Sequence, residues 1–368
     1  MLASGQGRKA ASLLAGILLA WPACHAVLFK STDDPTYNTG APTGALTNSG
    51  WDLQGWWGGS YLGTPIAPRY FVTAKHVGGS IGGYLGLGPI AYHTTAYYDD
   101  PNSDLRVWRV AETFPTYALL FTNTNEVGKH CVVFGRGTQR GAPIIVSGVT
   151  NGWAWGASDT WQRWGENDIS SIYVGGAGTG DLLRATLDRS GGSNECQLSV
   201  GDSSGAVFVQ DASNVWRLAG INHAVDDPFI STNGVGAGFN AAMLDYGGVY
   251  TNRGGFWQLC TNQSTDIPSA FYSTRISSHI TWIKSVIDYL PGDDLRITAI
   301  TATGTNVVIS FNTILNQSKY VIDRRDSITG GSWTNLTNGI VGAGGVMTYT
   351  DVGAATLSNR FYRLGLVP

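Results

Sequence analysis

The stretch Leu198-Ser-Val-Gly201-Asp202-Ser203-Ser204-Gly205-Ala-Val-Phe-Val209 carries the clearest signal in the chain. Glycines at 201 and 205 let the backbone turn sharply around Ser203 and leave room for backbone N–H groups beside its hydroxyl. The plain structural interpretation is an Asp-Ser-Ser-Gly turn between two strands. The chemical interpretation is an exposed serine nucleophile with hydrogen-bond donors placed for an oxyanion.

The same residues also fit Gly-x-Ser-x-Gly, the nucleophile elbow in which a helix follows the serine directly. Here the apolar runs 206–210 and 215–221, separated by the turn Asp211-Ala-Ser-Asn214, predict a strand, a turn and a strand. The elbow also needs an acid and then a histidine after the serine, and His279 lies inside a predicted helix. We therefore reject the elbow.

Two upstream stretches offer partners for a serine nucleophile. Tyr70-Phe-Val-Thr-Ala-Lys-His76 is an apolar strand that ends in a histidine, and Asn102-Ser-Asp104-Leu-Arg-Val-Trp-Arg-Val110 places an aspartate directly before an alternating strand. Taken alone, each is more often structural than catalytic. Asp99 and Asp100 are rival acids, and Asp104 is preferred because only it directly precedes the alternating strand.

Composition predicts an all-β protein with many tight turns. The 368 residues include 50 Gly, 13 Trp and 16 Tyr, and only 13% are charged. Such a chain is neither disordered nor a helical array. The net charge of −3, without a basic cluster, argues against a nucleic-acid partner. No acidic loop has the ligand spacing of a calcium site, so no cofactor or metal is expected.

Residues 1–26 are predicted to be a secretory signal, which makes the protein secreted and Val27 the first mature residue. Arg8 and Lys9 precede a short apolar run at 11–20, and small residues flank Cys24. A lipid-anchored Cys24 is the weaker alternative. No later stretch contains 18 consecutive apolar residues, so no membrane span is predicted. Three cysteines then remain, which predicts one disulfide and one free thiol in an oxidising compartment.

The mature chain divides into two parts. Residues 27–290 end in a helical stripe of apolar residues at 276–290, with Ser277 and Ser278 as N-cap candidates. The Pro-Gly-Asp-Asp sequence within residues 291–295 predicts a linker. Residues 296–368 alternate in short runs separated by turns, which predicts a small β-sandwich of fibronectin or immunoglobulin type.

Taken together, the three motifs resemble the trypsin/chymotrypsin-like serine endopeptidases. The resemblance lies in the order His76, Asp104, Ser203 and in the local contexts Thr-Ala-Lys-His and Gly-Asp-Ser-Ser-Gly. Three further stretches agree, at 128–137, 216–221 and 268–276. The resemblance covers residues 45–290 and implies two six-stranded antiparallel β-barrels with a C-terminal helix.

The resemblance also implies a mechanism. Ser203 would attack a peptide carbonyl, His76 would move the proton, and Asp104 would orient His76. Backbone N–H groups of Gly201 and Ser203 would form the oxyanion hole. Ser204 replaces a family glycine and is expected to be tolerated if its φ is negative.

Two supporting roles follow from departures from the family pattern. In the animal enzymes a freed N-terminus pairs with the Asp before the catalytic serine, but no Ile-Val-Gly-Gly start follows Val27 here. We therefore predict that Arg136 is the partner of Asp202. His223 stands where the family commonly has serine, and it is predicted either to contact the Asp104 carboxylate or merely to pack on its strand.

The sequence gives two candidates for the base of the specificity pocket and no local signal for the disulfide pairing. Glu195 and Gln197 are candidates for the base of the specificity pocket; Glu195 would favour basic substrate side chains and Gln197 would not. By the same resemblance, the pocket disulfide is Cys196–Cys260, and Cys131 remains a buried thiol. The partner is then a protein or peptide substrate, and the oligomeric state stays open.

Two other functions compete with an endopeptidase. One is a catalytically inactive relative used for binding. The other is a surface or carbohydrate binder that uses aromatic side chains of the C-terminal module, which are Trp333, Tyr349, Phe361 and Tyr362. Aromatic residues in a small sandwich are more often core than binding residues.

Overall fold

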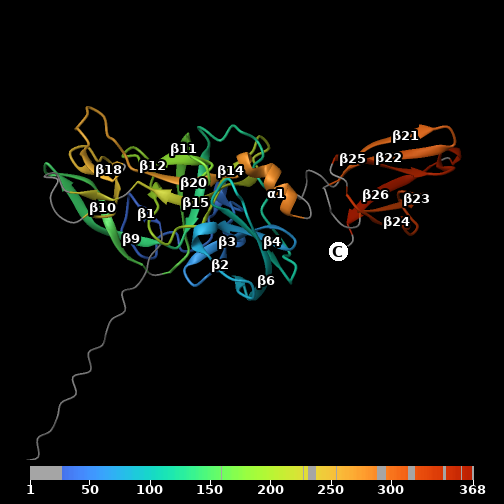
Figure 1. The fold of residues 1–368 in the computed structure, drawn as a ribbon, viewed down its shortest axis with the longest axis horizontal. Helices are drawn as coiled ribbons and strands as arrows, with labels where there is room; N and C mark the ends of the chain where they lie inside the picture. Colours follow the sequence, from blue (N-terminus) through green and yellow to red (C-terminus); the bar gives the residue numbers. More distant parts are fainter. Residues whose placement is uncertain are drawn as a thin grey trace, which may run out of the picture.

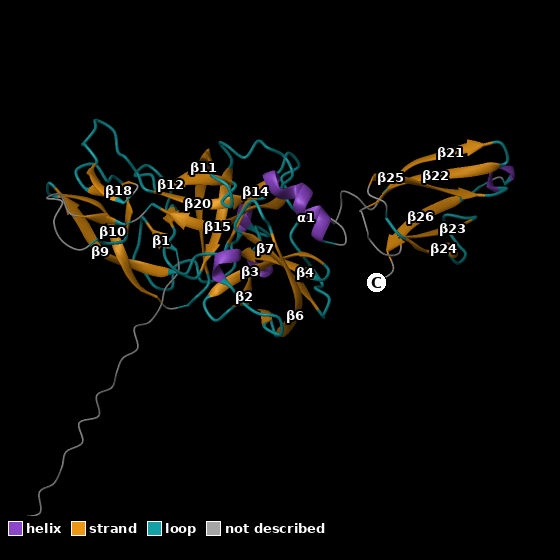
Figure 2. Cartoon of the chain, viewed as in Figure 1, coloured by secondary structure: helices purple, strands orange, loops and turns teal. Residues whose placement is uncertain are grey.

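Strands dominate the computed structural model, which describes residues 27–158, 160–226, 228–230, 238–253, 255–287, 296–313, 320–342, 345–357 and 359–366 (Figures 1 and 2). Two closed six-stranded antiparallel barrels are followed in sequence by one short α-helix and a small β module. The predicted fold class is therefore confirmed. Short 3₁₀ turns lie at Gly44–Leu46, Trp51–Leu53, Lys75–Val77, Ser277–His279 and Ala354–Thr356.

The first barrel has an aromatic interior. In hydrogen-bonded order its strands are β2 Gly55–Trp57, β3 Tyr61–Ala67, β4 Tyr70–Ala74, β7 Leu105–Val110, β6 Ile90–Asp99 and β5 Tyr84–Leu87. Trp108 of β7 packs against Trp57 and Phe71, with ring centroids 4.7 and 6.2 Å apart. The other face of β7 is buried too, because Leu105 and Val107 join the large apolar cluster that includes residues of both barrels. Asp104, which directly precedes β7, is buried as well.

The second barrel holds the serine stretch. Its hydrogen-bonded order is β11 Arg163–Val174, β12 Asp181–Thr186, β20 Ala270–Arg275, β15 Trp216–Val225, β14 Ala206–Gln210 and β8 His130–Gly135. Alternate residues of β14, Val207 and Val209, point into the same core as Val133 and Phe271. The strand, turn and strand predicted after Ser203 are β14 and β15, which pair antiparallel.

The predicted helix is shorter than its apolar stripe. The 3₁₀ turn Ser277–His279 leads into α1 Ile280–Val286, and residues 288–290 lie outside the described part of the chain. Ile276, Ile283 and Ile287 are buried in the apolar cluster shared by the two barrels, as the stripe predicts. The N-cap prediction is wrong. Ser277 Oγ donates to Glu126 and Ser278 Oγ to the Arg275 carbonyl, so neither hydroxyl caps the helix.

Two three-stranded sheets form a lobe beside the second barrel, around the labels β9, β10 and β18 in Figure 1. One sheet orders β17 Ala241–Met243, β10 Val149–Ser158 and β9 Thr138–Val146; the other orders β16 Phe229–Ile230, β18 Tyr250–Arg253 and β19 Phe256–Leu259. Val146, Phe229 and Met243 share one core cluster between the sheets. The glycine-rich insertion at 225–265 therefore contributes strands to an accessory lobe, which the sequence did not predict.

The described chain starts as a strand of this assembly. β1 Leu28–Phe29 pairs antiparallel with β13 Cys196–Gln197, and Val27, Leu28 and Phe29 are all buried. Residues 1–26 lie outside the described residues, as do the predicted linker residues 291–295.

The C-terminal module consists of two three-stranded sheets. One orders β21 Ile297–Thr303, β22 Asn306–Thr313 and β25 Gly345–Asp351; the other orders β24 Thr334–Ile340, β23 Tyr320–Arg325 and β26 Phe361–Leu366. Ile309 and Phe311 of β22 share a core with Tyr320 and Ile322 of β23, which joins the two sheets as layers of a sandwich.

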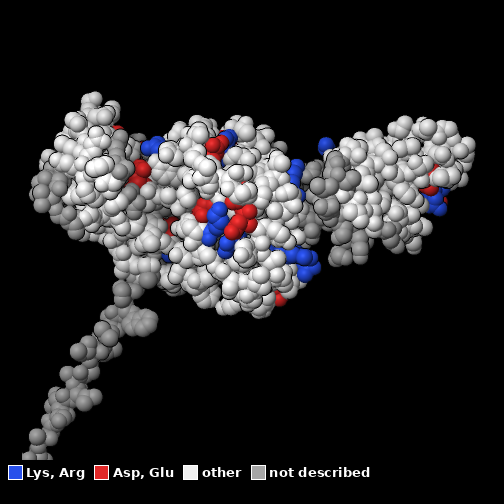
Figure 3. All heavy atoms as spheres, viewed as in Figure 1, with Lys and Arg blue, Asp and Glu red and all other residues white. Residues whose placement is uncertain are grey.

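Charged groups are sparse on the surface. The face in Figure 3 is mostly uncharged, and the acidic and basic side chains near its middle are intermingled. This distribution follows from a chain in which 13% of residues are charged. Among the described residues, no helix has the length and apolar character needed to cross a membrane.

Candidate active site

Strand pairing brings His76 and Asp104 together. β4 and β7 are antiparallel neighbours in the first barrel, with Ala74 opposite Leu105. His76 therefore follows the end of β4 at the point where Asp104 precedes β7. The Lys75 N–H donates to the Asp104 carbonyl at 2.6 Å, and the Lys75 ammonium donates to the Ser103 carbonyl at 2.8 Å. These bonds hold the two loop segments against each other.

The Asp104 carboxylate accepts three hydrogen bonds from two histidines. Its Oδ1 accepts the His76 backbone N–H at 3.0 Å, and its Oδ2 lies 2.5 Å from His76 Nδ1 and 2.9 Å from His223 Nδ1. Burial alone raises the pKa of Asp104, but the hydrogen bonds from His223 and His76 outweigh it and hold that pKa well below its usual range. Asp104 is therefore an anion, and each histidine donates from Nδ1.

The rival acids have other partners. Asp99 receives a bidentate pair from Arg106, with N–O distances of 2.6 and 2.9 Å. Asp100 accepts from Ser103 Oγ at 2.7 Å and lies 2.6 Å from His279 Nδ1. Asp104 is thus the acid that the structure brings to His76, in line with the preference based on its position before the strand.

The loop that carries Ser203 is tied to the strand that carries His76. Ser204 Oγ accepts the Ala74 N–H at 3.0 Å, and Ala74 lies two residues before His76. The Ser204 N–H donates to the Asn222 carbonyl at 2.9 Å, which is next to His223. Ser204 is therefore a bridge between the barrels, a role that the sequence did not suggest.

The condition set for tolerating Ser204, a negative φ, is not met. Its φ is +70°, a left-handed conformation that favours glycine. A short polar side chain tolerates this conformation better than a branched one, and the bond to Ala74 and complete burial hold it in place.

Backbone donors gather beside Ser203. Gly201 has φ of +95°, and an added Cβ would lie 3.0 Å from Gly137 Cα, so only glycine fits this turn. Within the described residues, no acceptor is found for the backbone N–H of Gly201 or of Ser203. Two such donors in one tight turn are suited to bind a developing oxyanion.

Asp202 is buried beneath this turn. Its carboxylate accepts the Gly137 N–H at 2.7 Å, the Ser199 N–H at 2.8 Å and the Val27 N–H at 3.3 Å. An added Cβ on Gly137 would lie 2.5 Å from Asp202 Oδ2, so glycine there makes room for the carboxylate. Burial raises the pKa of Asp202 to about 6, although the bonds from Gly137 and Ser199 oppose the rise.

The partners of Asp202 differ from the predicted one. The Arg136 guanidinium lies over the Trp56 ring, 5.6 Å from its centroid, and the bonds found at Asp202 come from other groups. One of these groups is the backbone N–H of Val27, the first residue after the predicted signal. Its pairing depends on β1 adding to β13, and a two-residue strand has no sequence signal.

A pocket of about 400 Å³ opens beside Ser203. It lies between the 198–203 and 222–225 segments and is also lined by Trp155 and Asn240 of the accessory lobe. Neither of the two residues predicted to form the bottom of the specificity pocket lines this pocket. The Glu195 carboxylate turns away and accepts the Asp188 N–H at 2.9 Å, and Gln197 is 1% exposed.

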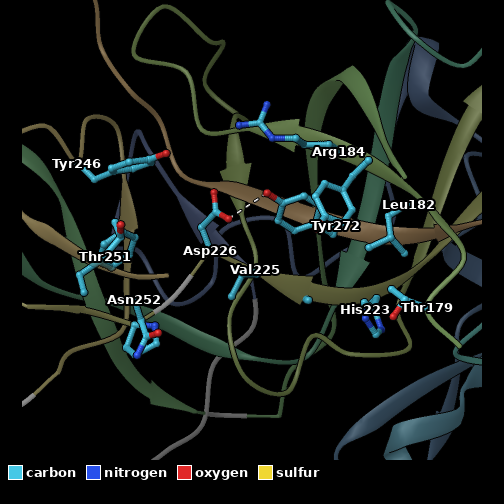
Figure 4. A pocket seen from close by; sticks show the side chains of 14 residues that line it. Thr179, Leu182, Arg184, His223, Val225, Asp226, Tyr246, Thr251, Asn252 and Tyr272 are labelled. Atoms are coloured by element: carbon cyan, nitrogen blue, oxygen red, sulfur yellow. Dashed lines mark hydrogen bonds between the residues drawn. The ribbon is translucent and has the colours of Figure 1, made fainter. Parts of the chain in front are cut away.

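A larger cavity of about 650 Å³ lies on the other side of the β15 end and shares His223, Ala224 and Val225 with the first pocket. In its wall the Tyr272 hydroxyl donates to Asp226 at 3.0 Å, and Figure 4 shows the two side chains next to each other. The end of β15 therefore contributes to the walls of both cavities.

The predicted disulfide is absent, since no bond joins Cys196 to Cys260 in the part of the chain that the structure describes. Cys196 points into the second barrel, where its Sγ would lie 2.4 Å from a Cβ added to Gly165. Cys260 lies just after β19 in the accessory lobe, with its N–H bonded to Val249. The prediction that Cys131 is a buried thiol is confirmed.

His76, Asp104 and His223 also have a donor set that could hold a metal ion, since their ligand atoms lie within 4.8 Å of one another. The separations of 2.5 and 2.9 Å between nitrogen and oxygen are those of hydrogen bonds. Hydrogen bonding therefore accounts for the close approach of these three side chains.

Comparisons with known proteins give a distant likeness. No protein-family model matches the chain, and no curated protein matches it. Among solved structures, the passenger domain of plasmid encoded toxin, an autotransporter enterotoxin from enteroaggregative Escherichia coli, is similar with 15% identity and a TM-score of 0.36. The match covers 67% of this chain and 23% of that one, so this chain spans about a quarter of that protein's length.

Proposed function

We propose that this chain is a secreted serine endopeptidase of the trypsin/chymotrypsin-like type. The observation that carries the proposal is the hydrogen-bonded pair His76–Asp104, with Nδ1 2.5 Å from Oδ2. The loop that carries Ser203 is tied to the same region, because Ser204 Oγ accepts the Ala74 N–H. Asp104 is an anion that keeps the His76 proton on Nδ1, which leaves Nε2 as the basic nitrogen.

In this mechanism Ser203 Oγ attacks the peptide carbonyl while His76 Nε2 takes the hydroxyl proton. The negative charge develops on the carbonyl oxygen, where the N–H groups of Gly201 and Ser203 stabilise it. Each such donor contributes roughly 3–4 kcal/mol in related sites. His76 then passes the proton to the leaving amine, and a water molecule repeats the sequence to hydrolyse the acyl-enzyme.

Val27 supplies a route to the active conformation. The structure has its backbone N–H 3.3 Å from Asp202 Oδ1, directly beneath the oxyanion turn. Cleavage before Val27 would convert this N–H donor into an ammonium ion that pairs with the buried carboxylate. If residues 1–26 are the signal, export and activation would share one cleavage.

Labelling with a serine-directed fluorophosphonate tests the proposal. The full mature chain is expected to be labelled at Ser203, and Ser203→Ala is expected to be neither labelled nor active, with turnover reduced about 10⁴- to 10⁶-fold. Asp104→Asn is a matched control that keeps the shape of the acid and should lose about 10⁴-fold. An unlabelled, folded wild-type protein would favour the inactive-relative alternative.

The carbohydrate-binding alternative has less support, because the aromatic side chains of the module have internal partners. The Trp333 ring lies between the guanidinium groups of Arg325 and Arg363, each 4.7 Å from its centroid. Tyr349 donates to the Leu336 carbonyl, and Tyr362 donates to Asp351. Side chains already engaged in this way are not free platforms for a sugar ring.

A further inference from the structure

The pocket beside Ser203 has mainly apolar walls. Leu198 and Val200 line one side, Ala224 and Val225 the other, and Trp155 reaches in from β10. The backbone N–H of Trp155 donates to the Asn240 carbonyl at 3.0 Å, which fixes these two residues of the accessory lobe to each other. The accessory lobe is therefore part of the wall.

Gln197, which could have made a deeper polar base, is withdrawn from the pocket. Its Nε2 donates to Ser269 Oγ at 3.0 Å, and its Oε1 accepts the Leu198 N–H at 2.9 Å. Ser269 is fully buried and its hydroxyl also bonds both the N–H and the carbonyl of Met243. These polar groups satisfy one another and offer nothing to a substrate.

The pocket also offers no free counter-charge. The Asp202 carboxylate lies under the backbone turn, where it accepts the N–H groups of Gly137, Ser199 and Val27. His223 Nδ1 is committed to Asp104. A charged side chain that entered this pocket would lose its hydration without gaining an ion pair, which costs several kcal/mol.

We propose that this pocket selects an uncharged, aliphatic side chain, such as Leu or Met, at the residue immediately before the scissile bond. The inference rests on the proposed function and deepens it, because it assigns the substrate class. Apolar wall residues favour a methylene-rich side chain, and the lack of a free counter-charge among the lining residues disfavours Lys, Arg, Asp and Glu.

A panel of fluorogenic peptides tests this. The peptides are identical except for Leu, Met, Arg, Lys or Glu before the scissile bond, and the enzyme is the full mature chain. The value of kcat/KM for Leu and Met is expected to exceed that for the charged residues by roughly 100-fold or more, since each 1.4 kcal/mol is tenfold. Equal or faster cleavage after Arg, Lys or Glu would overturn the proposal.

Asn240 supplies a matched pair of variants. It lines the pocket and is exposed, so a substitution there should not disturb folding. Asn240→Asp introduces a carboxylate and should raise the Arg-to-Leu ratio of kcat/KM about 5-fold, an effect typical of an exposed charge pair. Asn240→Leu should not raise it. An unchanged ratio in Asn240→Asp would mean that the substrate side chain lies elsewhere.

Fluorophosphonate labelling separates the two proposals. If Ser203 is labelled but the charged peptides are cleaved best, the pocket assignment fails and the endopeptidase stands. If Ser203 is not labelled and no peptide is cleaved, both fail.

Discussion

His223 Nδ1 lies 2.9 Å from Asp104 Oδ2, the same oxygen that faces His76 Nδ1. The two imidazole rings are 5.8 Å apart and nearly perpendicular. One carboxylate oxygen therefore contacts two imidazoles from different barrels, and we infer that His223 positions the Asp104–His76 pair.

His223→Leu should lower kcat/KM about tenfold, because the loss of one charge-assisted bond removes roughly 1.5 kcal/mol of support for the Asp104 anion. Loss of the His223 bond raises the pKa of Asp104 from its lowered value, so the acid limb of the pH–rate profile should move to higher pH. His223→Gln, which retains an N–H donor, should recover part of the activity. The measurement is a pH–rate profile for each variant, and superimposable wild-type and Leu profiles would contradict the assignment.

The conformation of Ser204 predicts which of two substitutions at this position leaves the protein more stable. Ser204→Ala keeps the strained φ of +70° and loses the bond to Ala74, so it should reduce the free energy of unfolding by about 1–2 kcal/mol. Ser204→Gly loses the same bond but relieves the strain, so it should be the more stable of the two. Urea denaturation monitored by Trp fluorescence gives both values, and an Ala variant at least as stable as the Gly variant would refute this account.

The pairing of Val27 with Asp202 predicts that activity needs a free N-terminus at residue 27. A chain with Gly-Ser added before Val27 should fold but lose at least about tenfold in kcat/KM. In the Asp202→Asn background, activity should already be low and the extension should have little further effect. N-terminal sequencing identifies each form. Full activity of the extended chain would contradict the pairing.

The pH dependence of this pair follows from the Asp202 pKa of about 6, which burial raises. Below pH 6 the carboxyl group takes up a proton in the uncleaved chain, so the bonds from Gly137 and Ser199 meet a neutral group. An ammonium ion at Val27 favours the anion and moves this transition to lower pH. Activity of the mature form should therefore persist to lower pH than that of any extended form.

Glu195 predicts a change of stability with pH that is independent of catalysis. Burial raises its pKa to about 7, from an unfolded value of 4.5. The folded state then holds the proton more tightly, so stability falls as pH rises from 4.5 to 7. Glu195→Gln should remove this loss and stabilise the protein by up to about 3 kcal/mol at pH 8 relative to pH 4.5. Chemical denaturation at both pH values measures it, and a pH-independent difference would oppose the prediction.

Local patterns predicted individual strands and the candidate residues at their ends, whereas the two barrels were implied by the family resemblance. Strand alternation predicts β4, β7 and β14, and the residues at their ends, His76, Asp104 and Ser203, are marked by their position at strand–loop junctions. The preference for Asp104 over Asp99 and Asp100 also came from such a position. These features depend on neighbours within a few residues, which is the range that a sequence pattern can report.

The errors concern contacts over long sequence separations. Val27 meets Asp202 across 175 residues, and the pocket wall at Trp155 comes from a hairpin whose fold into an accessory lobe has no local signature. Cys196 and Cys260 were expected to pair, but one points into a barrel core and the other lies in that lobe.

The sequence by itself determined the fold class, the order of the three chemical groups and the Gly-rich turn around Ser203, because each depends on local backbone preference and side-chain alternation. Only the tertiary structure decided that two histidines share one Asp104 oxygen, that Ser204 ties the barrels together, and that Gln197 is withdrawn from the pocket. Those outcomes arise where strands from different barrels meet, and barrel closure and packing, rather than local pattern, set the distances there.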